Sequence, residues 1–112
     1  MSRSLPALPD PIWDLFVAYP SPDRDAAREL FRRLLVPGYR VFLDIECLLP
    51  GDDWDLEIPQ AQRLSLVTVA LVSAKSESAH YARDEVHAGI ALSRAHPQRH
   101  RIVPVYLEGW TD

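Results

Sequence analysis

The sequence predicts a doubly wound α/β domain, in which helices cover both faces of a parallel sheet. Three observations support this prediction. Four short apolar runs alternate with helical patterns along the chain. The runs are apolar throughout, as strands buried on both faces of a parallel sheet are. Right-handed crossovers between such strands place helices on the two faces of the sheet.

Length and composition are those of one globular domain, with 112 residues, 47% hydrophobic and 25% charged. The net charge of -4 has the wrong sign for a surface that neutralises phosphates, so we expect no direct nucleic-acid binding. The single cysteine, Cys47, cannot form an intrachain disulfide. The N-terminus lacks a secretory pattern and no apolar run is long enough to span a membrane, so a soluble cytoplasmic protein is expected.

The leader and the first strand are separated by a change in pattern. Residues 1–11 carry three prolines and no apolar period, so they are predicted to be an extended leader. The domain is then expected to occupy residues 12–112. Residues 12–19 form a short apolar run that ends at Pro20, which predicts the first strand.

A helix and a second strand follow. Ser21 is placed to cap the helix, with Pro22 in its first position, and apolar residues recur at helical spacing as far as Leu35. Residues 40–44 form a second compact apolar strand, and residues 45–53 a loop.

The second half of the chain repeats this alternation. Residues 54–64 have helical spacing, but Pro59 cannot donate a backbone hydrogen bond, which leaves open whether the helix bends or begins there. Residues 66–72 are the strongest strand, rich in Leu and Val. An amphipathic helix is expected over residues 78–95 and a fourth strand over residues 101–107.

Open parallel sheets bind ligands beyond the carboxyl ends of their strands. In this chain those ends are the loops after Tyr19, Asp44, Ser73 and Leu107. The site is therefore expected at this edge.

Several other site classes do not fit the strand ends. A phosphoacceptor receiver needs clustered acids where this chain has Tyr19 and Pro20, and a flavin carrier needs backbone donors where it has Pro22. No nucleotide-binding glycine motif is present. The four histidines form no credible ligand set, so no metal site is predicted. Cys47 has no paired histidine and is interpreted as a bystander.

Five segments resemble a known family in the same order. They are 13–19 (WDLFVAY), 41–54 with VFLD and LPGD, 69–73 (VALVS), 78–85 and 101–107 (RIVPVYL). Together they resemble a Toll/interleukin-1 receptor (TIR) domain. The resemblance implies a flavodoxin-like sheet of strand order 2-1-3-4 in this chain, from which the fifth strand of the family is missing.

The resemblance implies one of two functions, NAD+ cleavage or noncatalytic assembly. In the enzymes of the family a glutamate follows an aromatic position by four residues on the third helix, as Glu85 follows Tyr81 here. Loss of nicotinamide leaves an oxocarbenium-like ribose, which a carboxylate can stabilise. Glu85 is therefore the expected catalytic residue, and the alternative is a solvated helix residue. NAD+ is expected as a substrate, with no cofactor.

The other expected substrate contacts lie at the strand ends. Trp54 either stacks on the nicotinamide ring or is buried against the sheet. Asp44 either accepts a ribose hydroxyl or caps the following loop, and Ser73 has the same two possibilities. The ring of Tyr19 is favoured as a core residue beside the cleft. The complete set is Tyr19, Ser21, Asp44, Trp54, Ser73 and Tyr81.

The loop after the second strand resembles the TIR segment that reaches a neighbouring subunit. Leu48, Leu49, Pro50, Gly51 and Asp52 are its central residues, and exposed leucines there would be unfavourable in water unless a partner covered them. The resemblance thus implies association with other TIR domains and a sensor domain or partner, in bacterial antiphage defence or immune-type signalling. A noncatalytic scaffold acting through TIR contacts remains the alternative.

Overall fold

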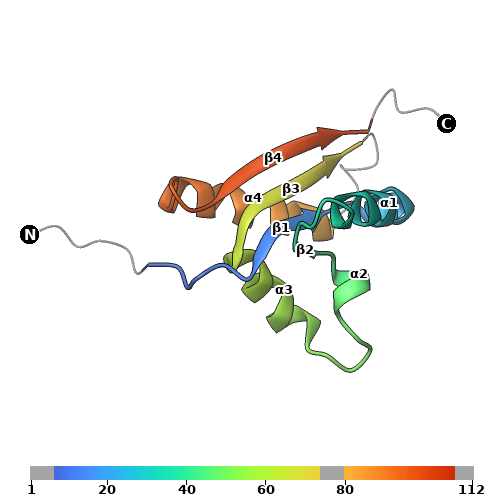
Figure 1. Ribbon diagram of the computed structural model, residues 1–112, viewed down its shortest axis with the longest axis horizontal. Coiled ribbons are helices and arrows are strands. Elements are labelled where there is room, and N and C mark those ends of the chain that lie inside the picture. Colours follow the sequence, from blue (N-terminus) through green and yellow to red (C-terminus); the bar gives the residue numbers. More distant parts are fainter. Residues whose placement is uncertain (1–6, 74–79, 108–112) are drawn as a thin grey trace, which may run out of the picture.

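A computed structural model describes residues 7–73 and 80–107 of the chain. Its strands form one parallel sheet in the order β2-β1-β3-β4 (Figure 1), which confirms the predicted fold class and strand order. The strands are β1 (Trp13–Ala18), β2 (Val41–Phe42), β3 (Ser65–Val72) and β4 (Arg101–Tyr106).

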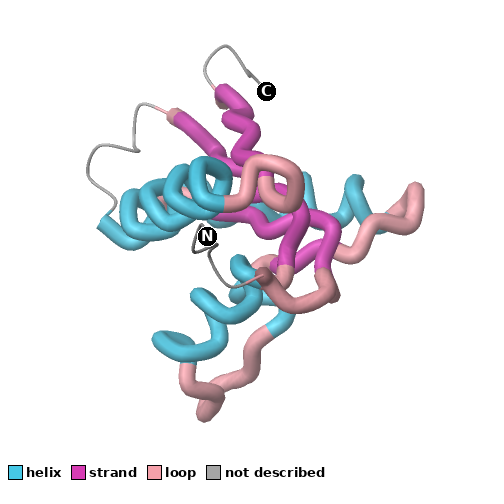
Figure 2. The backbone as a smooth tube through the Cα atoms, turned by 90° about the vertical axis from the view of Figure 1, so that its left-hand side faces the viewer, coloured by secondary structure: helices cyan, strands magenta, loops and turns pink. Residues whose placement is uncertain are grey.

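Helices cover the two faces of this sheet. A 3-10 turn, η1 (Ser21–Asp23), leads into α1 (Arg24–Leu35), and the other helices are α2 (Asp44–Cys47), α3 (Trp54–Arg63) and α4 (His80–Ala95). α1 lies on one face, and α3 and α4 lie on the other (Figure 1). The strands run between these helices in Figure 2.

The alternation of side chains along β1 divides the core between these two layers. Leu15 and Val17 of β1 face α1, where Val17 packs with Ala27 and Leu71. Phe16 and Ala18 face α3, where Phe16 stacks on Phe42 with 5.4 Å between ring centroids and Trp13 packs on the same cluster. This arrangement accounts for strands that are apolar throughout.

Three local expectations need correction or completion. The hydroxyl of Ser21 caps no helix, because the chain enters α1 through η1 and Pro20 is the residue before that turn. The predicted loop after β2 begins with the single turn α2, which is too short to show helical spacing. α3 begins at Trp54, where Asp53 accepts a hydrogen bond from the backbone N–H of Leu56, and Pro59 lies inside the helix.

A buried chain of hydrogen bonds joins α3, β3 and α4 to His100, the residue before β4. Gln62 Nε2 donates to Thr68 Oγ1 at 2.9 Å and to the carbonyl oxygen of Glu85 at 2.8 Å. Thr68 Oγ1 lies 2.8 Å from His100 Nε2, and His100 Nδ1 lies 2.8 Å from the carbonyl oxygen of Ser65. A carbonyl can only accept, so His100 donates from Nδ1. Burial lowers the pKa of His100, which favours the neutral ring, and its Nε2 then accepts the Thr68 hydroxyl.

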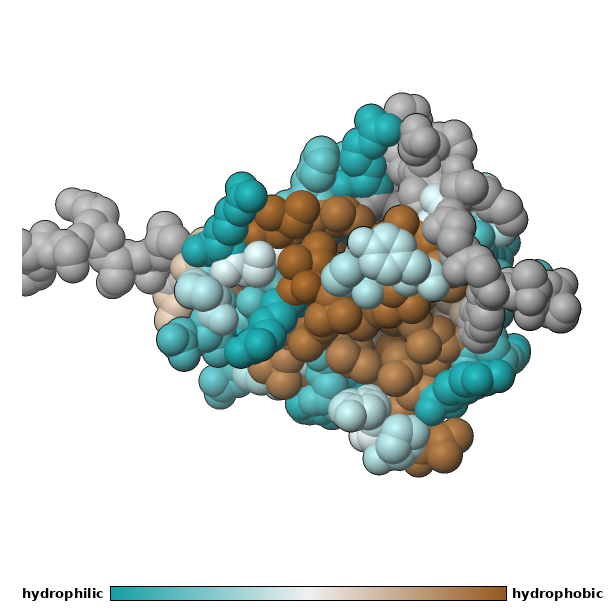
Figure 3. All heavy atoms as spheres, turned by 90° about the horizontal axis from the view of Figure 1, so that it is seen from above, coloured by the Kyte–Doolittle hydropathy of each residue, from teal (hydrophilic) through white to brown (hydrophobic). Residues whose placement is uncertain are grey.

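The edge strand β4 is less covered than the other strands. Val103 is 45% exposed and Tyr106 is 68% exposed. Figure 3 shows apolar residues gathered on the face of the molecule that carries β4. No described strand pairs with the outer edge of β4.

Candidate functional site

The ends of β1 and β2 bring a tyrosine and an aspartate together at the carboxyl edge of the sheet. Tyr19 follows β1, and Asp44 opens α2 just after β2. The Tyr19 hydroxyl donates a 2.8 Å hydrogen bond to Asp44 Oδ1, which also accepts the backbone N–H of Ile45 at 2.6 Å. Parallel strands end at the same edge, which is why residues 25 positions apart in sequence meet here.

Both of these side chains are buried, Tyr19 with 7% and Asp44 with 6% of their surface exposed. Burial is the main cause that raises the pKa of Tyr19 well above its ordinary value, and the hydrogen bond to Asp44 adds to it. The phenol therefore stays protonated and remains a donor. Its ring packs in the core while its hydroxyl holds Asp44, so it has both a packing and a polar role.

Glu85 on α4 is a buried carboxyl group in the same neighbourhood, with 8% of its surface exposed. Its pKa is raised to about 9, mainly by burial, and the negative charges of Asp44 and Asp84 contribute in the same direction. The ionised form of Glu85 would also raise the pKa of Tyr19. Tyr19, Asp44 and Glu85, here called the acid cluster, are thus electrostatically coupled, and Glu85 is uncharged at neutral pH.

A cavity of about 260 Å³ opens beside the acid cluster. Two aromatic residues, a serine, two aspartates, an arginine and an isoleucine line it. These residues are Tyr19, Ser21, Arg24, Asp44, Ile45, Trp54 and Asp55. Four of the six expected substrate-binding residues, Tyr19, Ser21, Asp44 and Trp54, therefore lie on one cavity.

Arg24, Ile45 and Asp55 also line the cavity, although no sequence motif marks them as site residues. Arg24 and Asp55 are polar residues in the first turns of α1 and α3, next to loops at the carboxyl edge. Their position near the strand ends is the only sequence feature that points to the site. It does not predict that they line the cavity, because the reach of a side chain depends on how its helix is placed.

The remaining expected contacts lie elsewhere or are not described. Ser73 donates a 2.5 Å hydrogen bond to Asp23 Oδ2 and is not among the lining residues of the cavity. Glu85 does not line it either, and is related to it through charge coupling with Asp44 and Tyr19. The side chain of Tyr81 falls outside the described residues. The roles of all these residues stay predictions.

The indole of Trp54 is tied to the preceding loop. Its Nε1 donates a 3.1 Å hydrogen bond to the carbonyl oxygen of Leu49, while its ring packs against the core cluster around Phe42. Trp54 is half-buried and borders the cavity. The ring thus packs on the core and also borders the cavity, and its stacking on nicotinamide stays a prediction.

The expected assembly loop, residues 48–52, exposes one of its two leucines. Leu49 is 68% exposed, whereas Leu48 packs against the cluster around Phe42. The expectation that both are exposed is wrong, because the turn of α2 directs the chain back toward α3 before Leu49. Asp52 closes the loop by accepting the backbone N–H of Leu49 at 2.8 Å, and Gly51 has a φ of 103° that favours glycine.

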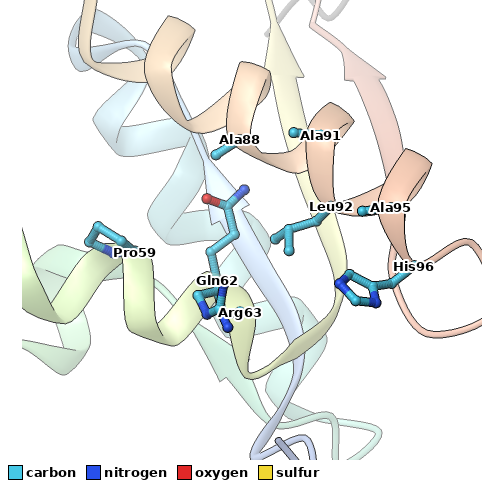
Figure 4. Close-up of a pocket in the computed structure, with 8 residues that line it drawn as sticks. All are labelled: Pro59, Gln62, Arg63, Ala88, Ala91, Leu92, Ala95 and His96. Carbon is cyan, nitrogen blue, oxygen red and sulfur yellow. The ribbon is translucent and has the colours of Figure 1, made fainter. Parts of the chain in front are cut away.

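A second hollow, of about 430 Å³, lies between α3 and α4 (Figure 4). Its wall on α4 is made of small or apolar residues, Ala88, Ala91, Leu92 and Ala95. Gln62 points from α3 toward α4 in Figure 4, but its amide donates to Thr68 and to the Glu85 carbonyl. Because this hollow has no carboxylate, the cavity beside the acid cluster is the better candidate for a site.

In the part of the chain that the structure describes, no three His, Cys, Asp or Glu side chains are grouped so that they could hold a metal ion. None of the described helices is both long and apolar enough to cross a membrane.

The fold and this edge define a flavodoxin-like α/β domain with a polar site at the carboxyl ends of its strands. Residues 15–112 match the family model described as the TIR domain. The match covers most of the chain, so the protein belongs to the TIR domain family. No curated protein matches the sequence.

Solved structures with this fold are distant in sequence. The TIR domain of the Toll-related receptor TRR-2 from Hydra magnipapillata superposes with a TM-score of 0.68 at 22% identity, over 82% of this chain and 68% of its own. A metazoan TIR-STING receptor from C. gigas gives 0.73 at 19% identity, over 96% of this chain and 35% of its own. The same receptor with 2',3'-cGAMP gives 0.70 at 20% identity, over 92% and 31%. The chain thus spans about a third of the TIR-STING receptor.

Proposed function

We propose that this TIR domain is an NAD+ nucleosidase, which hydrolyses the bond between nicotinamide and ribose and is active when TIR domains associate. The observation that carries the proposal is the buried Glu85, coupled by charge to Asp44 beside a cavity with two aromatic walls. Buried acids with strongly shifted pKa values are concentrated at catalytic sites. NAD+ is then a substrate and no cofactor is proposed.

The reaction breaks one C–N bond, and hydrolysis to ADP-ribose uses one water molecule, whereas cyclisation uses none. The bonding electrons go to the pyridinium nitrogen, so nicotinamide leaves as a neutral molecule without needing a strong acid. Positive charge develops on the ribose, where an ionised Glu85 would stabilise it. Water then adds to the ribose and releases a proton, giving ADP-ribose, or a nucleophile within ADP-ribose closes a cyclic product.

The charge state of Glu85 connects binding to this chemistry. Its pKa of about 9 keeps the free carboxyl protonated at neutral pH. The nicotinamide ring of NAD+ is a cation, and a nearby cation favours the ionised form of a carboxyl group. Substrate binding is therefore expected to lower this pKa and to generate the carboxylate at the moment it is needed.

The decisive experiment incubates concentrated protein with NAD+, with and without a crowding agent, and follows nicotinamide by chromatography. Glu85→Gln keeps the shape of the side chain and removes its charge, so it should lower nicotinamide release by at least about a hundredfold. Glu57→Gln, at an exposed position of α3, is the matched control and should be as active as the wild type. Circular dichroism checks that both variants fold.

A noncatalytic TIR scaffold is the alternative function. The exposed Leu49 and the uncharged state of Glu85 at neutral pH favour it. In that case the wild type would release no nicotinamide at concentrations where it self-associates, and Glu85→Gln would leave association unchanged. Under either function we propose a cytoplasmic protein that a sensor domain or partner clusters in immune-type or antiphage signalling.

A further inference from the structure

We infer that Arg24 is the residue through which this site recognises the phosphate of its substrate, so that it selects nicotinamide nucleotides over nicotinamide riboside. The inference rests on the proposed function and names the substrate feature that the cavity reads. Arg24 is the first residue of α1, and its side chain lines the cavity together with Tyr19, Asp44 and Trp54.

Arg24 makes no ion pair with any described residue. Arg28, Arg32, Arg33 and Arg40 all have carboxylate partners within 4.0 Å. Arg24 is exposed, and its charge acts on the buried Tyr19, which places it close to the acid cluster. A guanidinium on a cavity wall without a carboxylate partner keeps its donors for a ligand, and its planar fork suits a phosphate.

The charges around the cavity are mixed. Among its described lining residues, Arg24 is the only cation, while Asp44 and Asp55 carry carboxylates from α2 and α3. A purely anionic ligand would be repelled by these aspartates, and a purely cationic one by Arg24. A nicotinamide nucleotide has a cationic ring and an anionic phosphate in one molecule, so it can satisfy both signs of charge.

The size of the cavity agrees with a ligand that places its nicotinamide riboside portion inside and its phosphate at the rim. At about 260 Å³ it is smaller than the roughly 300–1,000 Å³ of pockets that enclose a drug-sized ligand. It can enclose a nicotinamide riboside portion but not a whole dinucleotide. The phosphate would then emerge near the rim, where an exposed arginine can reach it.

The test compares NAD+, nicotinamide mononucleotide and nicotinamide riboside as substrates of the wild type and of Arg24→Gln. Losing a hydrogen bond to a charged group should lower kcat/KM about ten- to a hundredfold for the two nucleotides, mainly through KM. The riboside has no phosphate, so its kcat/KM should change by less than about twofold. Arg24→Lys keeps the charge without the fork and should restore part of the loss.

Arg28→Gln is the matched control, because Arg28 lies one turn further along α1, pairs with Glu46 and does not line the cavity. It should leave all three substrates unaffected. Equal losses for nucleotides and riboside in Arg24→Gln, or no loss at all, would overturn the inference.

A binding measurement separates this inference from the proposed function. Calorimetry with ADP-ribose reports phosphate recognition without any reaction. If the wild type cleaves none of the substrates, the nucleosidase proposal fails. The role of Arg24 is then tested only by its effect on the affinity for ADP-ribose. Weaker binding by Arg24→Gln but not by Arg28→Gln would still support phosphate recognition. Equal affinities, or no measurable binding by the wild type, would exclude it.

Discussion

The hydroxyl of Tyr19 holds the carboxylate of Asp44 at 2.8 Å, and this bond joins the ends of the neighbouring strands β1 and β2. The same carboxylate charge acts on the buried Glu85 of α4. One hydrogen bond therefore positions a carboxylate that, after burial, contributes most to the raised pKa of the proposed catalytic residue.

Tyr19→Phe tests this bond. The ring keeps its packing, but Asp44 loses a donor, so the free energy of unfolding should fall by about 1.5 to 3 kcal/mol, as for other hydrogen bonds to charged groups. Urea denaturation measures the change. Tyr39→Phe is the control, because Tyr39 is 49% exposed and should change stability by less than about 0.5 kcal/mol. Equal effects of the two substitutions would mean that the Tyr19 bond contributes nothing specific.

The stability of Glu85→Gln relative to the wild type should increase as the pH rises. The pKa of Glu85 is raised from 4.5 to about 9, so folding binds a proton in this range. Proton binding by Glu85 therefore contributes fully to the free energy of unfolding of the wild type below about pH 4.5, and this contribution is lost progressively up to about pH 9. Glutamine does not titrate. Thermal melts across this range should show a growing advantage of Glu85→Gln, and a constant difference would argue against a buried, protonated Glu85.

The rate of NAD+ cleavage should depend on the same group. If an ionised Glu85 is required, kcat/KM rises with pH and levels off near pH 9, the pKa of the free protein. The bound cation lowers this pKa, so kcat should level off at a lower pH than kcat/KM. Initial rates of nicotinamide release between pH 6 and pH 10 give both profiles. If both pH profiles were flat over this range, ionisation of Glu85 would not control the rate of cleavage.

His100 should make the fold sensitive to acid. Burial lowers its pKa below the ordinary value of 6.5, and the neutral ring can donate to the Ser65 carbonyl and accept the Thr68 hydroxyl. The unfolded chain then binds a proton that the folded one does not, so stability falls as the pH drops below about 6.5. Arg99 and His96 act in the same direction as burial.

The readout for His100 is the slope of unfolding free energy against pH between pH 5 and pH 7. His100→Gln is expected to be less stable at all pH values, because it breaks the buried chain of bonds, but its slope should lose the His100 contribution. His96→Gln, at a half-buried loop position, should keep most of that slope. Identical slopes in the wild type and His100→Gln would contradict the neutral assignment.

Leu49→Ser should weaken self-association. Covering a leucine side chain that is 68% exposed contributes about 1.5 to 3 kcal/mol, so the dissociation constant should rise about ten- to a hundredfold. Sedimentation velocity over a concentration series measures it. Leu56→Ser on α3, where the side chain is 53% exposed, is the comparison outside the loop. If only Leu56→Ser weakened association, the proposed role of the loop in assembly would be contradicted.

The strands were predictable because their signal is local. The run of Leu and Val at 66–72 is observed as β3, Ser65–Val72, and the run at 101–107 as β4, Arg101–Tyr106. β2 was expected over residues 40–44 but spans two residues, because the chain turns into α2 directly after Leu43. The single turn of α2 is too short to show helical periodicity, and no periodic pattern in the sequence indicates that α3 continues through Pro59.

What the sequence determined by itself is the layout: apolar runs alternating with helical patterns allow few arrangements other than a parallel sheet, and its carboxyl edge must then collect Tyr19 and Asp44. The tertiary structure alone decided that Glu85 is buried, that Leu48 turns inward and that Arg24 reaches the cavity. The reason is that desolvation and charge coupling depend on which atoms surround a group in three dimensions, and residues distant in sequence supply those atoms.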